Sequence, residues 1–333
     1  MPFPSLPPRK METAMGNPQI VTLHDAAQGS RARVLVSQGF NCFEFETLVA
    51  GRKVRPLWAA EGHETGTHRP SGGGIPILFP FPCRIRGTEL LWQGRAYPLE
   101  EGDGRGNAIH GFVYNRPWRV VAQSERQVTG EFQASVDDPS LLARWPSDFR
   151  ITATYRLEGS SLVGSYELHN PGDEVLPFGF GTHPYFRIPP TAEGVADDCR
   201  LVVPVRRSWE LENLTPTGRL LDLPEASRFQ AGLPFSEAKF DNVFTGLVSH
   251  DGQIRAIVED VRGGVRVVQQ FGEAFRECVV YTPGSRDSVC IEPLTCVPDA
   301  FRLEPQGIDA GLRTLDPGQS QTLEVWITAE PLT

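Results

Sequence analysis

The stretch ITATYRLEGSSLVGSYEL, residues 151–168, decides the fold class of this chain. Apolar and polar residues alternate in 151–157, the turn residues Glu-Gly-Ser-Ser follow at 158–161, and a second run of the same kind occupies 162–168. A period of two is typical of a strand that buries one face, and a short glycine-containing connection is typical of a hairpin. The stretch therefore predicts two antiparallel strands.

Similar short runs recur at 32–36, 43–47, 254–258, 265–268 and 321–327. The 33 Gly and 29 Pro residues are spread between them, and helical turns are expected only near 138–144 and 298–301. This texture predicts an all-β antiparallel sandwich or barrel rather than alternating strands and helices. No Gly/Ser linker divides the strands, which favours one large domain over 19–333. Four prolines among the first eight residues predict a flexible N-terminal tail over 1–18.

Composition and charge argue against several classes of protein. The net charge is −9 without a basic block, so a nucleic-acid partner has no support. No apolar run approaches the roughly 20 residues that a membrane helix needs, and the N-terminus lacks the apolar segment of a secretory signal. Six scattered cysteines without a CxxC pair are expected to be buried thiols in a reducing cytoplasm. His63 and His68 are spaced one residue too far apart for HExxH, and neither a metal nor a cofactor is expected.

Two histidines stand in glycine-rich segments that suit a binding site. The segment PFGFGTHPYF, 177–186, places His183 before a proline, which favours an extended backbone, among small and flat neighbours. The segment GRGNAIHGF, 104–112, places His110 in a glycine-rich loop. Taken alone, His183 is more readily interpreted as a histidine hydrogen-bonded inside an aromatic core, and His110 is equally interpretable as a solvated loop residue.

Carboxylates and arginines supply the other candidates. Glu292 ends the apolar run at 289–291, where burial would raise its pKa toward that of a general base, although a strand-end salt bridge explains it as well. Arg84 and Arg86 would share one face of a strand, either at a ligand or in solvent. Asp241 lies in FDNVF, 240–244, as a ligand contact or a turn residue.

Taken together and in this order, the clusters resemble the aldose 1-epimerase family. The matching segments are GGGIPILFPFPCRIRG (72–87), GNAIHGFVYNRPW (106–118), LPFGFGTHPYFRIP (176–189), FDNVF (240–244) and CIEPLTCVPDAF (290–301). Each segment is weak alone, whereas five in register are specific. The resemblance implies a large antiparallel β-supersandwich of the galactose mutarotase type, with an open groove on one sheet face and a small-molecule sugar as substrate.

The resemblance also implies a role for each candidate residue. His183 matches the family's general acid and Glu292 its general base, which we expect on opposing sides of a sugar-sized hollow, protonated and ionised respectively. Arg84, His110 and Asp241 match sugar-binding positions. The implied reaction interconverts the α and β anomers of an aldohexose by acid–base ring opening and closure, and it needs no cofactor.

The chain departs from galactose mutarotases at several positions next to these residues. Cys83 stands where they carry Asn, and Ala108 where they carry a second His. Thr182 and Pro184 flank His183 where they carry Asn and Ser. These departures indicate a broader mutarotase-like group rather than a galactose mutarotase.

Three other functions stay open at this point. The first is a hexose-6-phosphate mutarotase, in which Arg86 or Arg187 binds the phosphate. The second is a glycoside hydrolase that uses Glu292 and Asp241 as its two carboxylates. The third is a non-catalytic carbohydrate-binding sandwich.

Overall fold

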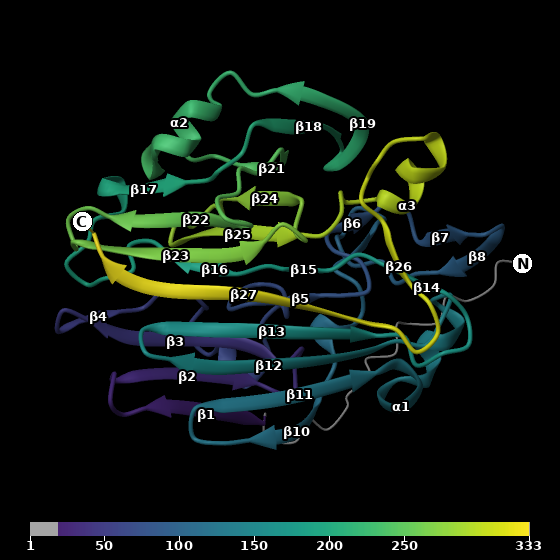
Figure 1. Cartoon of the computed structure of the whole chain (residues 1–333), viewed down its shortest axis with the longest axis horizontal. Coiled ribbons are helices and arrows are strands. Elements are labelled where there is room, and N and C mark those ends of the chain that lie inside the picture. Colours follow the sequence, from purple (N-terminus) through teal and green to yellow (C-terminus); the bar gives the residue numbers. More distant parts are fainter. Residues whose placement is uncertain (1–18, 333) are drawn as a thin grey trace, which may run out of the picture.

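The computed structural model describes residues 19–332, and the tail predicted at 1–18 lies outside this range. Strands make up most of its regular structure (Figure 1), with three short α-helices, α1 (Ala134–Asp137), α2 (Ala226–Ala231) and α3 (Ala300–Leu303). Every pairing between two named strands is antiparallel. The predicted all-β antiparallel architecture is confirmed.

The largest sheet has nine strands. In spatial order these are β10 (Arg119–Gln123), β11 (Gln127–Gln133), β12 (Arg150–Glu158), β13 (Ser161–His169), β27 (Ser320–Pro331), β23 (Val265–Gly272), β22 (Gln253–Asp260), β17 (Cys199–Val202) and β20 (Leu233–Pro234). The predicted hairpin is β12–β13, in which Leu157 pairs with Leu162. The C-terminal strand β27 lies between β13 and β23 (Figure 1), so it joins two hairpins that are far apart in the sequence.

An eight-stranded sheet carries the candidate site. It holds β5 (Ile77–Leu78), β15 (Gly181–Thr182), β16 (Tyr185–Arg187), β18 (Arg207–Glu212), β19 (Thr215–Asp222), β21 (Asp241–Thr245), β24 (Glu277–Tyr281) and β25 (Ser288–Leu294). The order of its main path is β19-β18-β21-β24-β25-β15-β5, and β16 also pairs with β25. The strand β25, which contains Glu292, therefore lies next to both β15 and β16, which flank His183.

Smaller sheets complete the architecture. One four-stranded sheet contains β1 (Ile20–Asp25), β2 (Ser30–Leu35), β3 (Asn41–Val49) and β4 (Arg52–Val54). The two-stranded sheets pair β6 (Arg84–Ile85) with β9 (Ala108–Ile109), β7 (Glu89–Trp92) with β8 (Arg95–Pro98), and β14 (Leu176–Phe178) with β26 (Arg313–Leu315).

The eight-stranded sheet is apolar on both faces because its side chains alternate between two clusters. Phe244, Val280 and Ile291 belong to the large core shared with the nine- and four-stranded sheets. Val243 and Val279, one position earlier on their strands, belong to a smaller cluster on the opposite face. Successive residues of a strand point to opposite sides, so this second face is turned away from the main core. Glu292 pairs with Val279 and lies on that second face.

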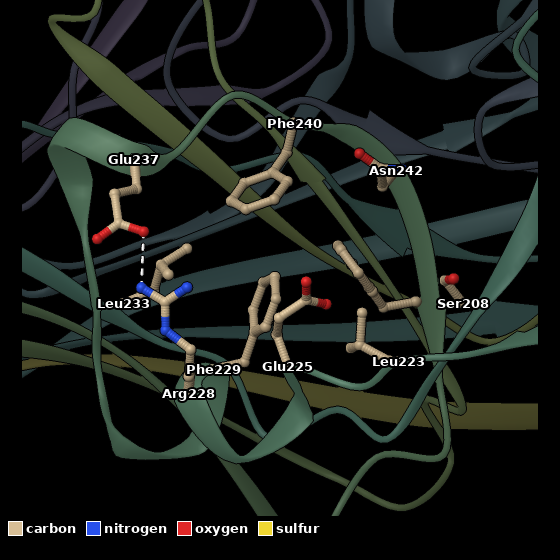
Figure 2. A pocket seen from close by; sticks show the side chains of 10 residues that line it. Ser208, Leu223, Glu225, Arg228, Phe229, Leu233, Glu237, Phe240 and Asn242 are labelled. Atoms are coloured by element: carbon tan, nitrogen blue, oxygen red, sulfur yellow. Dashed lines mark hydrogen bonds and ion pairs between the residues drawn. The ribbon is translucent and has the colours of Figure 1, made fainter.

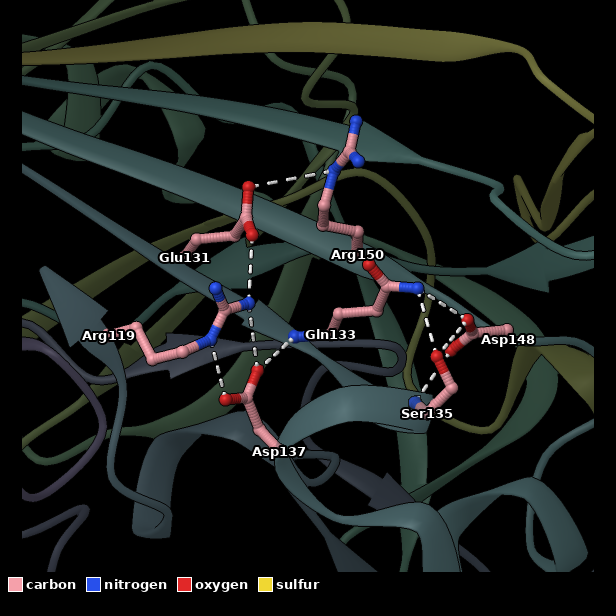
Figure 3. A network of polar contacts seen from close by, with 7 residues as sticks. All are labelled: Arg119, Glu131, Gln133, Ser135, Asp137, Asp148 and Arg150. Carbon is pink, nitrogen blue, oxygen red and sulfur yellow. Dashed lines mark hydrogen bonds and ion pairs between the residues drawn. The ribbon is translucent and has the colours of Figure 1, made fainter. Parts of the chain in front are cut away.

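A polar network ties one edge of the nine-stranded sheet to α1 (Figure 3). Arg119 donates hydrogen bonds to Asp137 at 2.7 Å and to Glu131 at 2.8 Å, and Arg150 lies 3.8 Å from Glu131. Arg119 is partly exposed, so each pair contributes little to stability by itself. We interpret this network as structural.

The cysteines fit the sequence prediction. All six are buried and none forms a disulfide. Burial raises the pKa of the thiols of Cys42 and Cys278, which makes them unreactive at neutral pH. Within the described range, no helix has the length and apolar character needed to cross a membrane.

Candidate active site

His183 and Glu292 form a cross-strand pair on the second face of the eight-stranded sheet. Gly181 pairs with Leu294, and Tyr185 pairs with Cys290, so the register places His183 directly opposite Glu292. Side chains that face each other across two strands lie close together. The imidazole Nε2 of His183 is 3.2 Å from Oε1 of Glu292.

This contact corrects one expectation from the sequence. The two groups do not flank a hollow from opposing sides, because they touch each other and project from the same sheet face. His183 is only 6% exposed and Glu292 only 2%. A ligand must therefore meet both groups from one direction, across their small exposed edge.

Burial also changes the expected protonation of the pair. It raises the pKa of Glu292, with a further increase from the nearby Asp241 carboxylate, and it lowers the pKa of His183, helped by the charges of Arg69 and Arg84. The direct contact opposes both shifts, because each charged form stabilises the other. An imidazolium–carboxylate pair and a neutral imidazole–carboxylic acid pair hold the same single proton. The pair thus titrates as one unit, and that proton can reside on either partner.

Cys83 supplies the second contact of the Glu292 carboxylate. Its thiol donates to Oε2 of Glu292 at 3.8 Å, and this weak hydrogen bond lowers the pKa of the carboxyl less than burial raises it. Cys83 has φ 51°, in the left-handed region, and its carbonyl accepts a hydrogen bond from the His110 backbone at 2.7 Å. The residue therefore links the base to the loop that carries His110.

Arg84 is held in place by Asp103, which directly precedes the glycine-rich segment 104–112 and was not named in the sequence analysis. Its Nε donates to Oδ2 of Asp103 at 3.0 Å, and the Asp103 side chain is 1% exposed. Asp103 also accepts hydrogen bonds from the side chain and backbone of Asn107 and from the backbone of Arg105. Although burial acts in the opposite direction, these bonds lower the pKa of Asp103 to about 2. The loop thus presents Arg84 as a fixed cation near Glu292.

The structure separates the two arginines of the 81–86 segment. The strand β6 ends at Ile85, and the Arg86 side chain donates to Oγ1 of Thr215 at 2.7 Å and lies 3.6 Å from Glu212. Arg86 is therefore engaged in a structural contact, whereas Arg84 acts on the pKa of Glu292 and of His183.

His110 lies beside His183 in a strained turn. The two rings meet edge to face, with centroids 5.4 Å apart, and His110 has φ 67°. Gly111 follows with φ 73°, and a Cβ there would stand 2.1 Å from the carbonyl oxygen of Phe79. Burial and the His183, Arg84 and Arg69 charges lower the pKa of His110, which keeps its imidazole neutral. Strained backbone at such a position is typical of functional sites.

Two ring nitrogens of these histidines have no protein partner. Nδ1 of His110 and Nδ1 of His183 are buried and make no hydrogen bond with any residue in 19–332. Buried polar atoms are nearly always paired, so such atoms call for an explanation.

Asp241 lies at the rim of this group. The register pairs Asp241 with Tyr281, and Tyr281 with Cys290, so these residues share the sheet face of Glu292, two positions along each strand. Asp241 is exposed, and its charge raises the pKa of Glu292. The five predicted residues therefore come together in one place.

The sequence analysis did not name two residues that lie beside the His183–Glu292 pair. Tyr185 stacks on His183 with ring centroids 4.9 Å apart and an interplanar angle of 8°, and its hydroxyl donates to the carbonyl of Ser71 at 2.8 Å. Arg69 precedes the Gly72–Gly74 turn, and its charge acts on the pKa of His183, His110 and Tyr281. Tyr185 lies in the segment 176–189, two residues after His183, and this spacing could have identified it from the sequence. No sequence pattern pointed to Arg69.

A separate hollow lies on the other face of β21 (Figure 2). Phe240, Asn242 and Phe244 line it, together with the ion pair between Arg228 and Glu237 at 2.6 Å. None of the five predicted site residues contributes to it. In 19–332, no group of three or more His, Cys, Asp or Glu side chains is arranged to hold a metal ion.

The chain is similar in sequence to a known family and to a known protein. The family model for aldose 1-epimerase matches residues 63–328. YphB, an uncharacterized protein of Escherichia coli K12, is 26% identical over 264 residues, which are 76% of this chain and 82% of YphB.

Solved structures show the same fold. A galactose mutarotase-like protein from Clostridium acetobutylicum superposes with a TM-score of 0.82 at 20% identity, covering 95% of this chain and 99% of the other. Galactose 1-epimerase from Lactobacillus acidophilus gives a TM-score of 0.69 at 18% identity, covering 93% of each chain. Because the family model spans most of its length, this chain belongs to the aldose 1-epimerase family.

Proposed function

We propose that this protein is an aldose 1-epimerase that interconverts the α and β anomers of an aldohexose. The contact of 3.2 Å between His183 Nε2 and Glu292 Oε1 carries the proposal. The reaction needs one proton acceptor at the C1 hydroxyl and one proton donor at the ring oxygen. A side-by-side acid and base that share a single proton supply both functions at once.

The separation of the two groups suits their targets. The C1 hydroxyl oxygen and the ring oxygen are bonded to the same carbon, so they are closer together than two hydrogen-bonded atoms. An acid and a base on one side of the ring, in contact with each other, can therefore each reach one of these oxygens. Groups on opposing sides of the sugar are not needed.

The two side chains of the pair can carry out both proton transfers. During opening, Glu292 takes the proton of the C1 hydroxyl while His183 gives its proton to the ring oxygen, and the C1–ring oxygen bond breaks to leave an aldehyde. Rotation about the C1–C2 bond presents the other face of the carbonyl. Closure then reverses both transfers, so the enzyme returns to its starting state without solvent or cofactor.

The surrounding residues fit a role in holding the sugar hydroxyls. Arg84 is a donor fixed by Asp103, and the exposed Asp241 is an acceptor at the rim. The neutral His110 offers one donor and one acceptor nitrogen. Hydrogen bonds to charged groups are the stronger kind, so Arg84 and Asp241 should contribute most to sugar binding.

We further propose that residues 19–333 act as one domain in the cytoplasm, where a reducing environment would preserve the six thiols.

The test is a screen for anomerisation by NMR or polarimetry on freshly dissolved free and phosphorylated hexoses. The proposal predicts that catalytic amounts of protein speed equilibration of at least one of them. Sugar binding in calorimetry without faster equilibration of any hexose would instead support a carbohydrate-binding module.

A further inference from the structure

A second group of side chains suited to a ligand lies on the sheet face of His183, further along the same strands. The pairs His183–Glu292, Tyr185–Cys290 and Arg187–Ser288 follow each other in register between β16 and β25. Residues two apart share a face, so Arg187 projects from the same side as His183. Four residues of extended chain separate their Cα atoms by about 13 Å.

The guanidinium of Arg187 has no partner among residues 19–332. Its Nε is buried and makes no hydrogen bond, and no carboxylate in 19–332 lies within ion-pair distance of it. Ser288, directly opposite on β25, has a fully buried hydroxyl that is also without a partner. Burial and the like charge of Arg55 lower the pKa of Arg187. Two unsatisfied donors side by side are costly unless something accepts their hydrogen bonds.

Arg187 borders a cavity of about 290 Å³, here called the Arg187 cavity, whereas Ser288 lies behind its wall. Its charged lining consists of Arg31, Arg33, Arg55, Arg187, Glu44, Glu61 and Glu64. Arg33 lies within ion-pair distance of Glu44, and Arg31 within ion-pair distance of both Glu44 and Glu46. Arg55 has only a loose contact of 3.7 Å with Glu46. Of these four arginines, Arg187 alone has no carboxylate within ion-pair distance in the described part of the chain, and Arg55 is the next most weakly paired.

The carboxylates that line the cavity indicate which other groups a ligand should carry. Neither Glu61 nor Glu64 forms an ion pair with any residue in the described part of the chain, although both border the same cavity as Arg187. They would repel a bare anion at close range, but they can accept hydrogen bonds from hydroxyl groups. A ligand with an oxyanion at one end and hydroxyls at the other would satisfy both sets.

We propose that the Arg187 cavity binds a small hydroxylated molecule through its phosphate or carboxylate group, held by Arg187 and Arg55. Guanidinium groups match the geometry of such oxyanions and bind them with two parallel hydrogen bonds. Along the chain, Tyr185 lies between His183 and Arg187, which lines the cavity. The oxyanion therefore belongs either to the far end of a sugar bound at that pair or to a separate ligand.

The test is calorimetric titration of the full chain with inorganic phosphate and with glucose 6-phosphate. Both should bind saturably to the wild type, inorganic phosphate the more weakly because Glu61 and Glu64 repel a bare anion. Glucose 6-phosphate should bind at least about tenfold tighter than glucose. Arg187→Gln should weaken the binding of both anions by about tenfold or more. Arg187→Lys should weaken it by a smaller factor, because lysine keeps the positive charge but lacks the two parallel N–H donors of the guanidinium. Arg262→Gln, at an exposed turn outside the cavity, is the matched control and should bind like the wild type.

Anomerisation kinetics then identify the source of the oxyanion. If Arg187→Gln raises the KM for glucose 6-phosphate alone, the oxyanion is part of the substrate; if it abolishes anion binding without changing either rate, the site is separate. The proposal is overturned if the wild type binds neither anion saturably, or if Arg187→Gln with an unchanged circular dichroism spectrum binds them as the wild type does. Because the titration measures binding directly, it tests this proposal even if the protein catalyses no anomerisation.

Discussion

The imidazole of His183 and the carboxylate of Glu292 are in direct contact at 3.2 Å, on neighbouring strands and almost entirely out of solvent. The contact follows from the register of β15 and β16 on β25, which places the two residues opposite each other. Because the pair shares one proton, any change that stabilises one charged form shifts the titration of the unit.

Replacing Cys83 by Asn should move the acidic limb of the pH–rate profile to lower pH. The side-chain amide is a stronger donor than a thiol, so it favours the ionised form of Glu292 and lowers the pKa at which the pair takes up a second proton. Asn also tolerates the left-handed backbone at this position, where φ is 51°. The measurement is kcat/KM against pH for wild type and variant.

Cys83→Ala provides the control, since it removes the donor and should move the same limb to higher pH. A shift confined to the alkaline limb in Cys83→Asn would mean that Glu292, not His183, holds the proton in the active form. An unchanged profile in both variants would show that the thiol does not tune the base.

Replacing Asp103 by Asn should weaken sugar binding more than it slows the chemistry. Asp103 orients Arg84 through a hydrogen bond of 3.0 Å but does not contact the acid–base pair. Loss of the charged acceptor frees the Arg84 side chain, and we expect KM to rise by about tenfold with kcat changed less than threefold. Steady-state kinetics decide this, and an equal loss in kcat with an unchanged KM would contradict it.

Substituting Ala for Gly111 should destabilise the protein far more than the same change at Gly104. Both glycines have positive φ, 73° and 69°, but a Cβ at 111 would stand 2.1 Å from the Phe79 carbonyl oxygen, whereas nothing lies within 4 Å at 104. Gly104→Ala should cost about 1 kcal/mol for its backbone conformation. Gly111→Ala should cost on the order of 3 kcal/mol or more, because the backbone must move. Denaturant unfolding of both variants measures the difference, and equal losses would refute the clash.

His63 should make the protein less stable as the pH falls. It is 1% exposed, neither ring nitrogen has a partner in the described part of the chain, and burial lowers its pKa to about 4. The unfolded chain binds the proton near pH 6.5 and the folded chain only near 4, so stability is lost as the pH falls through this window. At 1.4 kcal/mol per pKa unit, the loss at pH 5 is about 2 kcal/mol.

The variant His63→Leu should therefore lose less stability than the wild type between pH 7 and pH 5. His250→Gln, at an exposed position, is the control and should retain the wild-type dependence. The free energy of unfolding in urea at both pH values is the measurement. A parallel loss in His63→Leu and wild type would show that this histidine is not the titrating group.

The sequence predicted what depends on local patterns. Alternation in 151–168 gave the β12–β13 hairpin, because a strand with one buried face must repeat every two residues. The resemblance to the family selected His183, Glu292, Arg84, His110 and Asp241, and the structure brings all five together. Their catalytic and binding roles remain predictions.

What the sequence could not predict depends on register between distant strands. The contact of His183 with Glu292 arises because β15, β16 and β25 pair across more than a hundred residues, and no local pattern encodes that alignment. Burial of the pair, and therefore its shared proton, follows from the same packing. Asp103 is likewise recognisable as the anchor of Arg84 only once the loop is folded.

The most direct test of the central claim is the rate of anomer equilibration by Glu292→Gln and His183→Asn, followed by NMR on the best hexose substrate. The account predicts that each variant keeps the wild-type circular dichroism spectrum and loses at least about 100-fold in kcat. Because the pair acts as a unit, the double variant should lose little more. Glu125→Gln, at an exposed residue, should retain full activity. If folded Glu292→Gln and His183→Asn both equilibrate the anomers as fast as the wild type, the pair is not the acid–base machinery.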